Sequence, residues 1–267
     1  MMNKNILLGQ YCHADSWIHE RNAAGKILSS LLYMVALFIA DDWLGWGILA
    51  AVCVIAVLGS RIPLRSLWKT TRFILTFAAI TCVLNIFLYP GEELWRWGLL
   101  HITREGIYYG IAYGIRLLLL VEFASLLTLT TKPIRLTDGL EKLMAPLKVV
   151  KVPVHEIAMM MTIALRFIPT LLEEFQRITL AQRSRGADLG GKGNLLKKVS
   201  AMIPLLIPLF ISAFRRAEDL AQAMEAKCYR GGDRRTHWKR DPWKWQDTLL
   251  LLLFVLLTAA LIWWRVM

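Results

Sequence analysis

The sequence predicts an all-α, polytopic membrane protein with about five transmembrane helices and a cytoplasmic or interfacial region of coupling helices. Hydrophobic residues make up 56% of the 267 residues, and the mean hydropathy is +0.46. A soluble domain of this length has a more polar composition. The apolar residues also gather in long runs, which is the pattern that a bilayer-spanning helix requires.

Five apolar runs indicate the spans. The first run is short for a span, so it needs tilt or the help of residues 23–26. Asp41 and Asp42 separate it from the second run, and the later runs are long enough by themselves. In chain order the runs cover residues 27–40, 43–59, 73–89, 106–131 and 248–264.

The charged residues predict the orientation. The net charge is +12, and cytoplasmic loops of membrane proteins concentrate Lys and Arg. The loop 60–72 holds four basic residues and no acidic one, whereas the loop 90–105 mixes three Glu with two Arg. We therefore expect a multi-pass protein of the cell membrane with a cytoplasmic N-terminus and an external C-terminus. The predicted parts are a membrane region with about four spans at 1–131, a cytoplasmic coupling-helix region at 132–246 and a last transmembrane helix at 247–267.

The basic region contains two apolar stretches, 156–169 and 199–214, that are too short to cross a bilayer comfortably. We expect helices that lie along the inner leaflet or pack against the spans, and additional spans are the alternative. Pro204 and Pro208 favour a bend in the second helix. A polar helical stretch follows each, and glycines end both stretches.

The two polar stretches end in the same pattern, in which a cation lies between two small residues. A cation is favoured near any helix C-terminus, so solvated helix ends are the simplest interpretation. Small neighbours would also let a partner's backbone approach, so that the cation could reach carboxylates or carbonyls in a groove. We therefore expect two docking sites for a soluble partner. Their residues are Ser184, Arg185 and Gly186 in the first and Ala226, Lys227 and Cys228 in the second.

Two other function classes stay open. Glu122 lies inside the fourth predicted span, where a carboxylate is costly without a partner, and Arg116 precedes it by six residues. A self-contained secondary transporter that uses these two residues is the first alternative. A membrane-anchored interaction protein without a transport role is the second.

Catalysis and cofactor binding have little support in the sequence. Residues 186–193 match a phosphate-binding loop only in part, because Gly193 has no hydroxyl for magnesium and a helix precedes the loop. No metal-ligand spacing and no catalytic set stands out, so we expect no enzyme, no cofactor and no metal site. The basic and aromatic stretch 230–244 favours an anchor to the lipid bilayer over a nucleic-acid site.

At the two cationic segments the chain resembles the transmembrane T component of energy-coupling-factor (ECF) transporters. In that family two Ala-Arg-Gly or Ala-Arg-Ser motifs end two cytoplasmic coupling helices, and each motif inserts into an ABC-type ATPase subunit. Residues 184–186 match the first motif with Ser in place of Ala, and residues 226–228 occupy the second, between Ala223-Met224-Glu225 and Tyr229-Arg230-Gly231-Gly232. The N-terminal Gly9-Gln10-Tyr11, Asp15-Ser16 and Ile18-His19 also resemble the family's opening signature.

The resemblance implies a non-catalytic scaffold of an ECF-type ABC importer. Two separate ATPase subunits would bind and hydrolyse ATP, and the scaffold would reorient a substrate-binding membrane (S) subunit. The cargo would be a vitamin or a transition-metal ion, and a shared vitamin-type module is preferred. The coupling helices would be about 156–184 and 199–227.

The second motif departs from the family pattern. Lys227 lacks the planar fork of donors that Arg offers, and Cys228 restricts the backbone more than Gly does. We therefore expect an asymmetric grip on the two ATPase subunits, in which Arg185 is the stronger handle.

Overall fold

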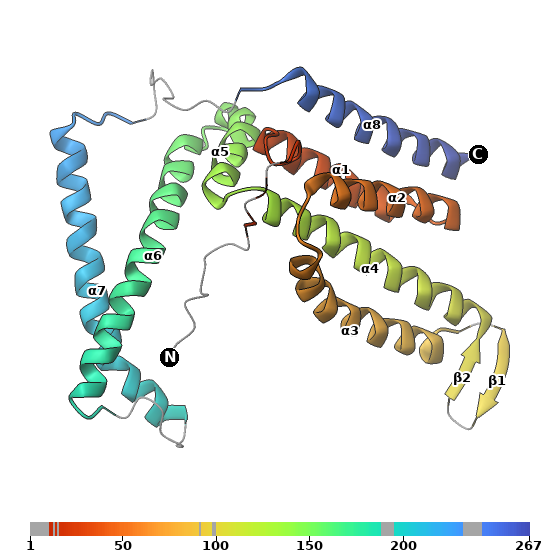
Figure 1. The fold of residues 1–267 in the computed structure, drawn as a ribbon, viewed down its shortest axis with the longest axis horizontal. Helices are drawn as coiled ribbons and strands as arrows, with labels where there is room; N and C mark the ends of the chain where they lie inside the picture. The colour runs from red at the N-terminus through yellow and green to blue at the C-terminus, as the bar shows by residue number, and fades with distance from the viewer. Residues whose placement is uncertain are drawn as a thin grey trace. The chain divides into compact units, whose positions relative to one another are not determined.

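The structure is a computed structural model that describes residues 11–12, 14, 16–90, 92–97, 100–187, 195–231 and 242–267. These residues are mostly helical, and one short β-hairpin is present among them (Figure 1). The predicted all-α class is confirmed. The chain divides into two compact units. Unit 1 combines Met1–Leu143 with Lys239–Met267, and unit 2 is Met144–Trp238.

Unit 1 contains the helices α1, α2, α3, α4, α5 and α8 and the antiparallel pair of strands β1 and β2. The helix α3 packs along α4, and α1 packs along α8. The bounds are α1 (Ala23–Ile39), α2 (Trp43–Ser60), α3 (Leu64–Leu88), β1 (Glu93–Trp97), β2 (Leu100–Thr103), α4 (Arg104–Thr130), α5 (Pro133–Met144) and α8 (Trp245–Val266).

A side-chain cap fixes the start of α1, and an aromatic cluster forms part of the core of unit 1. The Asn22 side chain accepts a hydrogen bond of 2.9 Å from the Ala24 N–H, which explains why α1 begins before its apolar run. Tyr33 on α1 is fully buried, and its ring stacks on Phe123 of α4 with 3.9 Å between the ring centroids. Phe254 of α8 meets the Tyr33 ring edge-on. The core therefore joins three helices that are distant in sequence.

Among the described residues, five helices are long and apolar enough to cross a membrane, but they differ in part from the five predicted spans. They are α2, α3, α4, α6 and α8. The first predicted span corresponds to α1, which has 17 residues and is therefore about 26 Å long, somewhat short of a bilayer core. The helix α6 qualifies because the apolar stretch 156–169 and the polar stretch after it form one continuous helix.

Unit 2 contains η1 (Ala145–Val150), α6 (Val154–Ser184) and α7 (Leu195–Ala226). Figure 1 shows α6 and α7 running in opposite directions and crossing. An ion pair between Glu174 of α6 and Arg216 of α7 joins the two helices. The ribbon of α7 bends in its N-terminal part, and Pro204 and Pro208 lie inside this helix.

Two segments expected to be loops carry regular structure, and the predicted coupling-helix region begins with a helix of unit 1. The helix α3 begins at Leu64, inside the basic loop 60–72, directly after the N-capping Pro63. The loop 90–105 contains the hairpin of β1 and β2. The helix α5 follows the fourth span, and its Gly139 lies so close to α1 that a Cβ there would be 2.9 Å from the Ala24 nitrogen. Unit 2 therefore begins at Met144, whereas the predicted coupling-helix region begins at residue 132.

Candidate functional site

The first candidate docking site is the C-terminal end of α6. Arg185 is the last residue with near-helical angles (φ −86°, ψ 7°), and Gly186 follows in the left-handed region with φ 84°. The Gly186 N–H donates to the Arg183 carbonyl at 3.0 Å, and the Ala187 N–H donates to the Gln182 carbonyl at 3.0 Å. This pair of bonds is a Schellman motif.

The second candidate site repeats this geometry at the end of α7. Cys228 takes the left-handed conformation with φ 54°. Its N–H donates to the Glu225 carbonyl at 2.8 Å, and the Tyr229 N–H donates to the Met224 carbonyl at 3.0 Å. The donors and acceptors have the same sequence offsets as at the first site. Lys227 therefore occupies the same capping position as Arg185.

All six predicted site residues are exposed, so the structure presents both cations to the surroundings of unit 2. The glycine in the first motif is required by its φ rather than by crowding, because a Cβ on Gly186 would meet no atom within 4 Å. At the second motif, Cys228 adopts a conformation that costs a residue with a Cβ about 1 kcal/mol.

The two sites lie at opposite ends of the crossed helix pair, because α6 and α7 run in opposite directions (Figure 1). The ion pair between Glu174 and Arg216 lies between them. Glu174 precedes Arg185 by eleven residues, and Arg216 precedes Lys227 by eleven. Each cation is therefore about 16 Å along its helix from the same ion pair.

A pocket lies next to the second site. This pocket of about 420 Å³ lies beside Lys227, where the end of α7 faces the first half of α6. Its walls combine methionine and isoleucine side chains with two cations. The lining residues are Met159, Ile163, Met224, Lys227, Cys228, Tyr229, Arg230 and Gly231.

Glu122 and Arg116, the residues of the secondary-transporter alternative, have different partners. Glu122 accepts a hydrogen bond of 2.7 Å from the Thr71 hydroxyl. Arg116 donates from Nη2 to the Ala40 carbonyl at 2.8 Å and lies 3.5 Å from the Asp41 carboxylate. The Glu122 contact joins α4 to α3, and the Arg116 contacts join α4 to the segment between α1 and α2, as structural polar contacts do.

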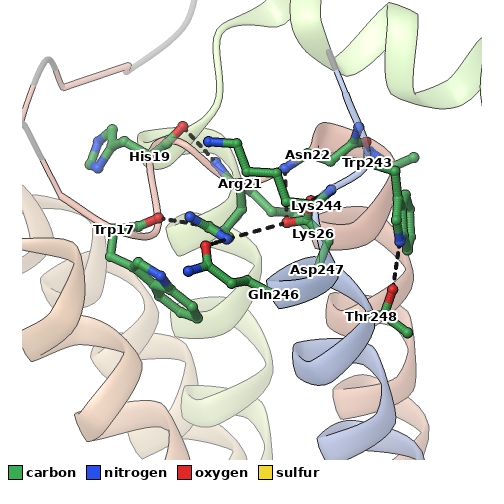
Figure 2. Close-up of polar contacts among 11 residues, drawn as sticks. Trp17, His19, Arg21, Asn22, Lys26, Trp243, Lys244, Gln246, Asp247 and Thr248 are labelled. Atoms are coloured by element: carbon green, nitrogen blue, oxygen red, sulfur yellow. Dashed lines mark hydrogen bonds and ion pairs between the residues drawn. The ribbon is translucent and has the colours of Figure 1, made fainter.

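A buried polar cluster was missed by the sequence reasoning. Figure 2 shows it at the start of α1 and α8. Arg21 and Asp247 are 4% and 3% exposed, and the Arg21 Nη1 lies 4.0 Å from the Asp247 Oδ1. Asp247 also accepts hydrogen bonds from the N–H groups of Asn22 at 3.3 Å and Lys244 at 2.9 Å. No spacing signal connects residues so distant in sequence.

Lys26 links the same region to α4. Its Nζ donates to the Thr130 carbonyl and to the Thr131 hydroxyl, both at 3.2 Å, and to the His19 carbonyl at 3.4 Å. The segment before α1, the end of α4 and the start of α8 are therefore tied together by buried polar contacts.

Several sequence predictions fall wholly or partly on residues outside the described ranges. They concern Gly9, Gln10 and Asp15 of the opening signature, residues 188–193 of the partial phosphate-loop match, and residues 232–241 of the basic stretch. Within the described part of the chain, no three His, Cys, Asp or Glu side chains gather as a metal site would require.

The comparison with known proteins identifies the family. Residues 14–238 match the family described as cobalt transport protein (CbiQ). The chain is 48% identical over 260 residues to the energy-coupling factor transporter transmembrane protein EcfT of Acidaminococcus fermentans, covering 96% of this chain and 97% of that protein. It is 49% identical over 239 residues to the protein of the same name from Ruminiclostridium cellulolyticum, covering 90% of this chain and 89% of that one. The protein of that name from Listeria innocua is 42% identical over 265 residues, or 99% of this chain and 100% of the relative. The chain therefore belongs to the family of ECF transporter transmembrane (T) components, and it is a multi-pass membrane protein.

Proposed function

We propose that this chain is the scaffold on which two ABC-type ATPase subunits and a substrate-binding S subunit assemble. Arg185 and Lys227 each dock into one ATPase subunit, and those subunits bind and hydrolyse ATP. The scaffold itself is not an enzyme and holds no cofactor. It converts closure of the ATPase pair into reorientation of the S subunit, which takes up a vitamin or a transition-metal ion.

The observation that carries this proposal is the shared geometry of the two helix ends. Both place a cation at the capping position directly before a left-handed residue, with the same two backbone hydrogen bonds. The residues differ, since one left-handed position holds Gly186 and the other Cys228. A backbone geometry shared by two different sequences would let two similar partners bind both helix ends in the same way.

The positions of the two sites constrain how unit 2 lies. Because Arg185 and Lys227 end antiparallel helices, a pair that crossed the bilayer would place one cation on each side. Docking to two cytoplasmic subunits needs both on one side. We therefore place α6 and α7 along the cytoplasmic surface, although α6 is apolar and long enough to span. The N-terminus then lies in the cytoplasm and the C-terminus outside.

Assembly and transport test the docking residues together. The chain is co-expressed with its candidate ATPase and S subunits, purified, and reconstituted for ATP-driven uptake. Arg185→Ala and Lys227→Ala should each reduce recovery of the ATPase subunits and uptake by about tenfold or more, because each removes charge-assisted hydrogen bonds. Arg185→Ala should have the larger effect, since the Arg fork offers two parallel bonds.

Arg183→Ala is the matched control. Arg183 is exposed on the last turn of α6, two residues before Arg185, but it is not at the capping position. Normal assembly of this variant with loss in Arg185→Ala would support a specific dock. Normal assembly and transport by both docking variants would overturn the proposal, and uptake by the chain alone without ATPase subunits would favour the secondary transporter.

The side of the membrane is tested by labelling. Cys228 is exposed, and an Arg185→Cys variant in a Cys228→Ser background adds a probe at the other helix end. A membrane-impermeant thiol reagent should label neither position in intact cells and both in inside-out vesicles. Labelling of one position from each side would contradict the placement along the surface.

A further inference from the structure

A groove of about 830 Å³ lies in unit 1 between α2 and α8, and α1 and α4 form its floor. The helix α8 packs on α1, and α2 packs on α4. At one end the two walls approach each other, because the Trp264 Nε1 donates to the Asp42 carboxylate at 3.1 Å. A Cβ on Gly45 would also lie 3.4 Å from Leu261. The groove is therefore a wedge that is closed at that end.

The interior of the wedge is lined by apolar side chains, and its open end, the mouth, also has polar and charged ones. Aliphatic and aromatic side chains line the depth, including Val52 of α2, Phe123 of α4 and Leu256 of α8. The mouth, at the opposite end of α2 and α8, is lined by Trp17, Arg21, Lys26, Trp245 and Gln246. Tryptophans beside cations at one end of an apolar surface are typical of the membrane–water interface.

Arg21 gives the mouth its specificity. Its side chain is almost fully buried, its Nε donates to the Trp17 carbonyl at 3.1 Å, and its Nη1 donates to the Gln246 side chain (Figure 2). A guanidinium has five N–H donors. The Nη2 of Arg21 makes no hydrogen bond to any residue that the structure describes. The mouth therefore offers the Arg21 Nη2 donors to an anion beside the positive charge of Lys26, while the Asp247 carboxylate, 4.0 Å from the Arg21 Nη1, balances the charge of Arg21.

We propose that this groove binds one anionic glycerophospholipid, with its acyl chains between α2 and α8 and its phosphate accepting from the Arg21 Nη2, close to the positive charge of Lys26. The volume lies within the range of ligand sites, and basic pockets between transmembrane helices bind anionic headgroups. A transmembrane helix of a partner would fill the apolar depth but would leave the guanidinium donors at the mouth without an acceptor.

Thermal unfolding of the full-length chain in detergent micelles tests the site. Phosphatidylglycerol should raise the Tm by about 5 °C, and phosphatidylcholine with the same acyl chains should raise it much less. Ala56→Phe fills the groove from α2 and should abolish the shift. Ala51→Phe is the matched control, because Ala51 is exposed on the same helix outside the groove, and it should keep the shift.

Equal shifts with the two lipids, or an unchanged phosphatidylglycerol shift in Ala56→Phe, would overturn the proposal. Crosslinking keeps the test decisive if Ala56→Phe does not fold. Leu253→benzoylphenylalanine places a photoreactive group in the groove, and Val255→benzoylphenylalanine places one on α8 outside it. After irradiation in membranes, the variant with the photoreactive group at position 253 should form a phospholipid adduct. Added phosphatidylglycerol should compete with the bound lipid and reduce the yield of that adduct. Equal lipid adducts at both positions, or an adduct with a protein at position 253, would refute the lipid site.

Discussion

The two units of this protein hold their helices together with ion pairs in different surroundings. In unit 1, Arg21 and Asp247 join the start of α1 to the start of α8, and their side chains are 4% and 2% exposed. In unit 2, Arg216 and Glu174 join α7 to α6, and their side chains are 35% and 26% exposed. The same chemistry therefore contributes differently to each unit.

Burial decides what such a pair does. Removing one partner of a buried pair leaves a desolvated charge, which costs about 3–5 kcal/mol, whereas an exposed pair contributes about 0–1 kcal/mol. Unit 1 is consequently a frame that resists rearrangement at its polar end. In unit 2 the angle between the crossed helices α6 and α7 can change at a small cost in free energy, which suits helices proposed to transmit motion.

The largest expected effect is in the buried cluster. Asp247→Ala should lower the free energy of unfolding by about 3–5 kcal/mol, because Arg21 loses its carboxylate and the N–H groups of Asn22 and Lys244 lose their acceptor. Denaturant unfolding in detergent micelles measures this change. Asp219→Ala, at an exposed position of α7, is the control and should change the value by less than about 0.5 kcal/mol. Similar values for the two variants would remove the contrast between the units.

The helix end at Gly186 is expected to show the next largest effect. Gly186→Ala should destabilise the end of α6 by about 1–2 kcal/mol, because φ 84° disfavours any residue with a Cβ. Amide hydrogen exchange at Ala187, whose N–H closes the motif, reports this locally. Exchange there should become faster, while the amides of α1 stay unchanged. Unchanged protection at Ala187 would show that the Schellman motif is not what orders this end.

The opposite sign is expected at the second helix end. Cys228→Gly should stabilise the end of α7 by about 1 kcal/mol, since glycine adopts the left-handed conformation without the Cβ penalty. Slower hydrogen exchange at Tyr229 would report it. Cys228→Ala is the control and should leave the exchange nearly unchanged, because it keeps the Cβ. If glycine and alanine had the same effect, the thiol rather than the backbone would be responsible.

The smallest effect is expected at the crossing. Glu174→Gln should cost at most about 1 kcal/mol, because the pair with Arg216 is partly solvated. A double-mutant cycle with Arg216→Gln isolates the coupling between the two side chains. A coupling as large as that of the buried pair would mean that the crossing is rigid and would contradict the comparison.

The fold was largely predictable from apolar runs and helix-ending residues. The predicted coupling helices, 156–184 and 199–227, agree within four residues with α6 and α7. The short hairpin of β1 and β2 was not predicted, because a strand of four or five residues in a mixed-charge loop has little periodicity. The helix α3 extends into the basic loop because Lys and Arg are good helix formers.

The residues of the candidate site could be proposed from the sequence, but the backbone geometry around them could not. The cations could be found because each lies between small residues at the end of a helical pattern. The left-handed conformation of Cys228, which matches that of Gly186, could not be predicted, because a residue with a Cβ disfavours it. The cluster around Arg21 and Asp247 was out of reach because tertiary packing alone brings these residues together.

The equal spacing along α6 and α7 has a mechanical consequence for the proposed function. With the pair of Glu174 and Arg216 as a fulcrum, Arg185 and Lys227 stand at the tips of two lever arms of equal length, about 16 Å each. A scissoring rotation of about 10° per helix would displace either tip by about 3 Å. The mechanical advantage is therefore the same for both arms, and two ATPase subunits pulling on chemically unequal handles would still deliver strokes of equal length.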